Sequence, residues 1–164
     1  DSFNIISDWY HFAILELMAT SDFRDDRKWI AKALGIRVTE ANAAIERLVR
    51  VGLIEIRSDG TWKHMTDGRT SISPNYTSAA MRSMQRQILE KAIDALENIP
   101  FEVRDQSSIA TAMNSKLLPQ AQDKITKFRR ELAAFVRSEG PLDTVYQLSI
   151  SLYPLTQTDR KEKL

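Results

Sequence analysis

Few residues in this sequence could form a metal site or a nucleophilic centre. There is no cysteine, and the two histidines, His11 and His64, fall in different expected elements. A structural or catalytic zinc site normally needs three or four converging ligands, so the sequence favours no metal site. His11 has apolar neighbours on both sides, and we interpret it as a packed structural residue.

The motifs of common enzyme classes are also missing from the sequence. It contains no GxSxG, HExxH or P-loop pattern, and five glycines leave no glycine-rich phosphate cradle. Asp25 and Asp26 form an adjacent carboxylate pair, but acidic residues at this place stabilise the start of a helix. We therefore expect neither an enzyme nor a cofactor.

Polar side chains between residues 37 and 64 are of the types that contact DNA. Asn42 could read adenine, and Arg47 could read guanine or bind a phosphate. Arg and Lys side chains outside the reading helix could bind phosphates. The candidate DNA-contacting residues are Arg37, Thr39, Asn42, Arg47, Arg50, Arg57, Lys63 and His64.

A second group of basic residues recurs near the C-terminus at helical spacing. It consists of Lys124, Lys127, Arg130 and Arg137. Such a face could bind a nucleotide, a phosphorylated partner or the DNA backbone. The alternative is a solvated helix surface, on which Lys127 and Glu131 form an ordinary i,i+4 pair.

The first half of the chain reads as three helices followed by a β-hairpin. Apolar residues at helical spacing, helix-stopping glycines and an Asp59-Gly60 turn signal support this order. Asp25 or Asp26 could cap the second helix, and Thr39 the third. The expected helices span residues 9–18, 27–34 and 39–50, and the expected strands span residues 53–57 and 61–65. This order predicts a winged helix-turn-helix.

The second half reads as helix, strand, helix, strand. Residues 78–98 and about 119–137 have helical periodicity, whereas residues 101–113 and 146–152 alternate between apolar and polar types. Two strands rarely form a stable sheet alone. Either the helices cover them or another chain completes the sheet, and the end of the first of these helices near Met81 is a second candidate dimer surface.

These elements predict an α+β fold in two parts. We expect the winged helix-turn-helix at residues 1–68, a linker at 69–77, a regulatory or dimerisation half at 78–156, and a charged tail at 157–164. The net charge of +1 divides into −2 for residues 1–68 and +3 for the remainder. The half expected to read DNA is therefore the less basic one, and Glu40 and Glu46 lie on the same face as Asn42.

Composition excludes several other classes of protein. With 43% hydrophobic and 27% charged residues, the chain can bury a core. No apolar run approaches the roughly 20 residues of a membrane span, and no signal segment opens the chain. We expect no membrane association and a cytoplasmic location. The first residue, Asp1, leads us to expect an excised fragment or a processed chain.

The chain resembles a bacterial family known as domain of unknown function 4423. The residues that carry the resemblance are the segments FNIISDWYHFAILELM, WIAKALGI, EANAAIERLVRVGLIE and VYQLSISLYPLT. The resemblance covers nearly the whole sequence and implies the C-terminal region of a transcriptional regulator, in which a separate helix-turn-helix usually precedes this part. It implies no catalytic or ligand-binding residues.

We therefore expect the winged-helix and regulatory region of a bacterial transcriptional regulator. It would bind double-stranded DNA, or control DNA binding by an upstream reader, as a homodimer. The alternatives are a protein–protein interaction adaptor and a small-molecule sensor, neither of which would contact DNA.

Overall fold

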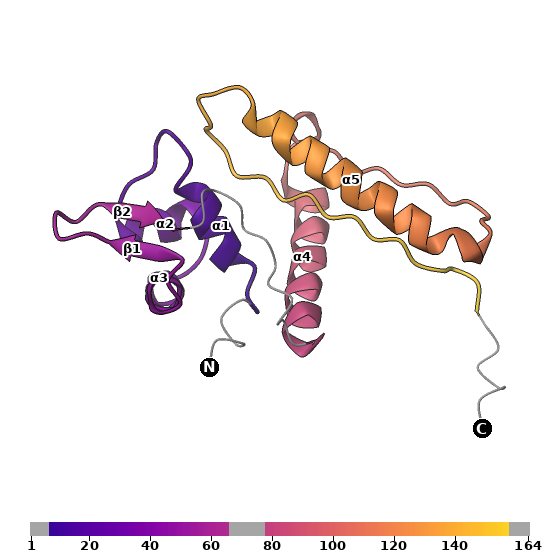
Figure 1. The fold of residues 1–164 in the computed structure, drawn as a ribbon. Coiled ribbons are helices and arrows are strands. Elements are labelled where there is room, and N and C mark those ends of the chain that lie inside the picture. The colour runs from indigo at the N-terminus through magenta and orange to yellow at the C-terminus, as the bar shows by residue number, and fades with distance from the viewer. Residues whose placement is uncertain (1–6, 66–77, 158–164) are drawn as a thin grey trace.

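The structure is a computed structural model, and it describes residues 7–65 and 78–157. The fold is α+β, with five α-helices and one small antiparallel sheet in these ranges. The first half gathers three helices and the sheet, and the second half contains two longer helices (Figure 1). The predicted linker at 69–77 and nearly all of the predicted tail lie outside the described residues.

The helices of the first half are α1 (Tyr10–Leu17), α2 (Arg27–Leu34) and α3 (Val38–Arg50). Asp26 caps α2 by accepting a hydrogen bond from the backbone N–H of Lys28 at 2.9 Å. Gly35 ends α2 in the left-handed region at φ 66°, where glycine avoids the steric cost of a Cβ atom. Both features confirm the prediction for this helix.

The prediction that Thr39 caps the third helix is wrong. Arg37 is the N-cap residue of α3, and the Glu40 carboxylate accepts a hydrogen bond from its backbone N–H at 2.8 Å. The Arg37 guanidinium also donates to Glu40 at 3.2 Å. The cap of α3 therefore lies two residues before Thr39, and the hydrogen bonds from Arg37 lower the pKa of the Glu40 carboxyl group.

The hairpin consists of β1 (Ile54–Ile56) and β2 (Trp62–His64). The strands are antiparallel, and Glu55 lies opposite Lys63. The Asp59 carboxylate accepts hydrogen bonds from the backbone N–H and hydroxyl of Thr61, and Gly60 has φ 87°. The hairpin prediction is confirmed, although each strand has only three residues.

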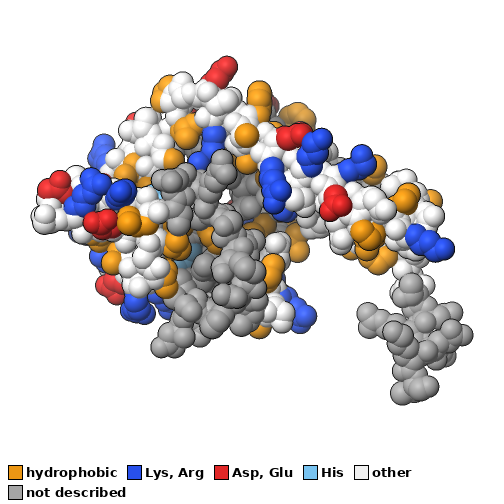
Figure 2. All heavy atoms as spheres, viewed as in Figure 1, with side chains coloured by type: hydrophobic (Ala, Val, Ile, Leu, Met, Phe, Trp, Pro, Cys, Tyr) orange, Lys and Arg blue, Asp and Glu red, His pale blue; other side chains and the backbone are white. Residues whose placement is uncertain are grey.

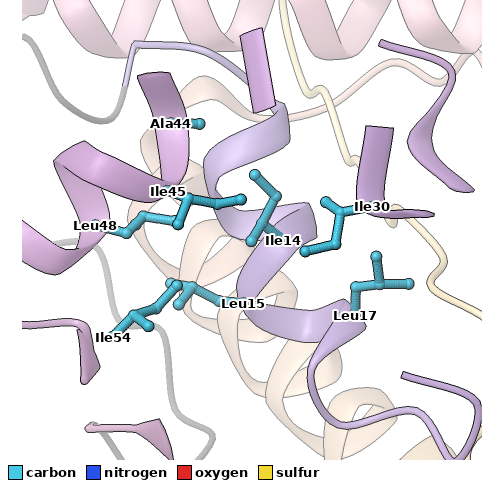
Figure 3. Packing of buried hydrophobic residues seen from close by; sticks show 8 residues of the cluster. All are labelled: Ile14, Leu15, Leu17, Ile30, Ala44, Ile45, Leu48 and Ile54. Atoms are coloured by element: carbon cyan, nitrogen blue, oxygen red, sulfur yellow. The ribbon is translucent and has the colours of Figure 1, made fainter. Parts of the chain in front are cut away.

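A single apolar cluster joins the elements of the first half (Figure 3). It draws on α1, α2, α3 and β1, and Trp62 of β2 packs against its edge. The residues of this core cluster are Ile14, Leu15, Leu17, Ile30, Ala44, Ile45, Leu48 and Ile54. His11 is buried beside it, as expected of a packed histidine.

The second half has α4 (Ser78–Asn98) and α5 (Leu118–Arg137), with short 3₁₀ turns at Phe101–Val103 and Ser115–Leu117. The prediction that residues 101–113 and 146–152 are strands is wrong for the single chain. Residues 105–113 and 143–157 contain no described strand, and none of their backbone amides donates to a described backbone carbonyl. The alternating pattern is present, but this chain supplies no neighbouring strand to pair with it.

Contacts at both ends of α1 connect the second half to the first. The backbone N–H of Trp9 donates to Gln87 Oε1 at 3.1 Å, and Lys91 Nζ lies 3.9 Å from the centroid of the Trp9 ring. After α5 the chain returns, where Ser21 donates to the Leu142 carbonyl at 2.8 Å and Val145 packs against the core cluster. The first-half core is therefore completed partly by a residue from far along the sequence.

Candidate nucleic-acid interface

Helix α3 is the element that could present side chains to DNA. Its inner residues Ala41, Ala44, Ile45 and Leu48 are buried against α1 and α2, which fixes the outer face toward solvent. The exposed or half-buried residues on that outer face are Thr39, Asn42, Glu46, Arg47 and Arg50. The hairpin follows α3 after the three residues 51–53 and so lies next to its C-terminal end.

Three of the arginines at this face lie beside carboxylates. Arg37 pairs with Glu40 at 3.2 Å, and Arg47 lies 4.0 Å from Asp8. Arg27, which the sequence reading did not single out, lies 3.6 Å from Glu46. These pairs reduce the local positive potential that DNA phosphates would meet.

Asn42 is partly engaged within the chain. Its Oδ1 accepts a hydrogen bond from Arg27 Nη1 at 3.5 Å, the long limit for such a contact. The two residues also line an open hollow of about 560 Å³ between the start of α2, the start of α3 and the hairpin. The residues around this hollow are Asp25, Asp26, Arg27, Lys28, Val38, Asn42, Ile56 and Trp62.

The basic residues in or nearest the hairpin have acidic neighbours but no close ion pair, since Glu55 lies opposite Lys63 and the Arg57 charge contributes to lowering the pKa of Asp59. Within residues 7–65 and 78–157, no carboxylate lies within 4.0 Å of Arg50, Arg57 or Lys63. Arg57 stands in the exposed hairpin loop, and Lys63 is exposed on β2. His64 differs from them because it is half-buried opposite Ile54. Of the predicted set, Arg50, Arg57 and Lys63 are therefore exposed and have no ion pair in the described parts of the chain.

Buried and half-buried polar groups at the start of α1 contact Asp8, which lies near Arg47 of α3. His11 Nδ1 lies 3.2 Å from the Asp8 carbonyl, and burial lowers the pKa of its imidazole. The Tyr10 hydroxyl donates to Asp8 Oδ2 at 3.2 Å. Burial, together with the nearby Asp8 charge, raises the pKa of Tyr10 to about 12. Trp9 is the N-cap residue of α1 and makes no side-chain cap hydrogen bond.

The second basic group does not form a cluster in space. Lys124 and Arg137 stand 13 residues apart on α5, which corresponds to about 20 Å along a helix. Lys127 pairs with Glu131 at 3.8 Å, and Arg137 pairs with Glu16 of α1. Figure 2 shows basic side chains spread along the arm that contains α5. The structure thus places these residues along an open helix surface.

The described residues offer no sign of a metal or membrane site. No group of three or more His, Cys, Asp or Glu side chains within them could hold a metal ion. Among the same residues, no helix has both the length and the apolar character needed to cross a bilayer.

Comparison with known proteins gives one match. No curated protein and no solved structure is significantly similar to this chain. One family model, described as a domain of unknown function (DUF4423), matches residues 1–155. Since the match covers almost the whole sequence, the chain belongs to the DUF4423 family.

Proposed function

We propose that this chain is the non-enzymatic C-terminal region of a bacterial transcriptional regulator, and that it contacts duplex DNA through α3 and the β1–β2 hairpin as a homodimer. The order of three packed helices followed by a hairpin supports a winged helix-turn-helix. In that motif the second helix of the helix-turn-helix enters the major groove, a role that α3 would take here.

The observation that carries the proposal is the placement of Arg50, Arg57 and Lys63. Arg50 ends α3, Arg57 lies in the hairpin loop and Lys63 lies on β2. All three are exposed and have no carboxylate within ion-pair distance in the described parts of the chain. The Arg37–Glu40 pair is largely exposed, and the Arg47–Asp8 pair is half-buried with its charged atoms 4.0 Å apart. Exposed pairs contribute only about 0–1 kcal/mol. A phosphate can therefore compete for these arginines at low energetic cost.

The charge of this half limits the strength of the interaction. Residues 1–68 have a net charge of −2, and Glu40 and Glu46 stand on α3 itself. We expect non-specific binding in the micromolar range at low salt, because few phosphates would be neutralised. Such binding would suit a module that assists an upstream DNA reader.

The test is fluorescence anisotropy of the 164-residue chain with a labelled random-sequence 20-base-pair duplex over a salt series. The wild type should bind at low salt, and its affinity should fall steeply as salt rises. Arg57→Ala should weaken binding evenly across sequences and reduce the salt slope by about one. Arg86→Ala, which removes the same charge from an exposed position on α4, should leave the slope unchanged.

Two outcomes would overturn the proposal. One is the absence of binding at low salt, and the other is identical salt slopes for the wild type, Arg57→Ala and Arg86→Ala. The first outcome would assign α3 and the hairpin to contacts with other proteins.

A further inference from the structure

The second half leaves most of its large apolar side chains in solvent. Of the 24 large apolar residues exposed in the described ranges, 20 lie after residue 78. They include residues on the helices, such as Ile93 on α4 at 64% exposed and Phe135 in the last turn of α5 at 72%. Monomeric soluble proteins rarely leave so much contiguous apolar surface uncovered.

Two segments of this half also lack backbone hydrogen bonds. Residues 105–113 and 146–152 are irregular in the single chain, and their amides donate to no backbone carbonyl among the described residues. Figure 1 draws both segments as long traces near α5, without a paired strand. Apolar Tyr146, Leu148, Ile150 and Leu152 alternate with polar residues, as in a strand with one buried face. Each segment therefore presents unpaired backbone amides, as a strand at the edge of a sheet does.

The solvent-accessible surface of the chain is larger than that of a compact monomer of its length. It is 13187 Å², whereas a compact monomer of 164 residues exposes about 8,300 Å². Even if residues outside the described ranges are allowed the full exposure of an extended chain, an excess of about 1,600 Å² remains. A standard stable interface buries about 800 Å² from each partner, so the excess is sufficient for a dimer.

We infer that a second copy of this chain covers this surface, with residues 105–113 and 146–152 forming strands of a sheet shared between the two copies. This assignment rests on the homodimer part of the proposed function and names its interface. Each copy has segments without a neighbouring strand and helix faces without an apolar cover. A second copy can provide both the neighbouring strand and the cover. Identical strands can pair antiparallel about a two-fold axis, which keeps the alternating apolar face on one side.

Charge distribution favours the same partner. Residues 90–105 carry five acidic and two basic side chains, whereas residues 116–137 carry six basic and two acidic ones. A second copy therefore brings a segment of opposite charge to each of these regions. Two copies can associate without like-charge repulsion dominating the contact.

The test is analytical ultracentrifugation of the full chain with substitutions on alternate residues of one strand. The wild type should sediment as a dimer at low micromolar concentration. Ile150→Asp should raise the dimer dissociation constant at least 100-fold, because it places a charge in the shared apolar face. Ser149→Asp, on the opposite face of the same strand, should change it less than fivefold.

Ile150 is already 40% exposed in the single chain, so Ile150→Asp should leave the monomer folded, as circular dichroism can confirm. Hydrogen exchange adds a readout that needs no variant. Amides of residues 107–113 and 146–152 should be protected in the dimer and lose protection together on dilution.

The outcomes separate the claims. A wild-type monomer at 100 µM would overturn both the homodimer and its interface. A dimer in which these amides exchange freely, or which tolerates Ile150→Asp as well as Ser149→Asp, would overturn the interface alone. DNA anisotropy is measured separately, so failure of DNA binding would leave this inference intact.

Discussion

Gln87 on α4 donates a hydrogen bond from its Nε2 to Oδ1 of Asp8 at 3.1 Å, which fastens the second half to the start of the first helix. The same amide nitrogen also donates to the Ser7 carbonyl. The other carboxylate oxygen of Asp8 lies 4.0 Å from Arg47 Nη1 on α3. Asp8 therefore links α4 to Arg47, a candidate DNA-reading side chain.

Replacing Asp8 with asparagine should strengthen DNA binding. Asp8→Asn keeps the oxygen that accepts from Gln87 but removes the negative charge that faces Arg47. A partly exposed pair at 4.0 Å contributes about 1 kcal/mol, so we expect duplex affinity at low salt to rise about two- to fivefold. Anisotropy with the random-sequence duplex measures this change.

The matched control is Asp123→Asn on α5, which makes the same chemical change away from α3. It should leave duplex affinity unchanged. Equal effects of the two variants would indicate a response to net charge alone, and unchanged affinity in a folded Asp8→Asn protein would contradict a role of Arg47 in DNA contact.

The buried His11 should make the first half sensitive to acid. Burial lowers the pKa of His11 below its ordinary value of 6.5, so the native state favours the neutral ring. The unfolded chain binds a proton below pH 6.5, and stability is therefore lost as the pH falls from 6.5 toward the folded pKa. The loss can reach about 1.4 kcal/mol per pH unit. Urea unfolding at pH 7.5, 6.5 and 5.5 measures it.

His11→Phe is the control for this effect. Phenylalanine can keep the stacked contact with the Tyr10 ring, whose centroid lies 5.2 Å from that of His11, but it cannot titrate. The stability of this variant should vary less between pH 7.5 and 5.5. An equal pH dependence in both proteins would show that His11 does not cause the effect.

The sequence predicted the first half well because its signals are local. Helix periodicity, the Asp26 cap, Gly35 and the Asp59-Gly60 turn each act within a few residues, and the structure has the elements that they indicate. The start of α3 was misplaced because the backbone N–H of the cap is bonded by a carboxylate three residues later, from Glu40, and not by a Thr39 hydroxyl.

Features that depend on distant residues could not be read in this way. Nothing local marks Val145 as a contact of the first-half core, or Asp8 as a partner of Gln87 and Arg47. The alternation in residues 146–152 predicted a strand that is absent, because a strand needs a neighbour to pair with and the described part of the chain provides none. The candidate DNA-contacting residues were likewise chosen by type, and their ion pairs emerge only from the packing.

Truncation of Leu48 tests the core that holds α3 in place. Leu48 is completely buried, whereas its neighbour Val49 on the same helix is 37% exposed. Leu48→Ala should lower the free energy of unfolding by about 2–5 kcal/mol, since it removes apolar contacts and leaves a cavity. Val49→Ala should cost less than about 1 kcal/mol. Comparable losses for both variants in urea unfolding would show that the core does not depend on this face of α3.

The phenol of Tyr10 should ionise only at high pH. Burial and the neighbouring Asp8 carboxylate raise its pKa to about 12, because both disfavour the phenolate. The folded state therefore holds this proton more tightly than the unfolded state, whose tyrosine pKa is about 10. The associated stability is complete below pH 10 and is lost as the pH rises toward 12.

Absorbance at 295 nm should show a late ionisation step that Tyr10→Phe removes and Asp8→Asn shifts to lower pH. A late step that persists in Tyr10→Phe would belong to another tyrosine and would contradict the role of Asp8.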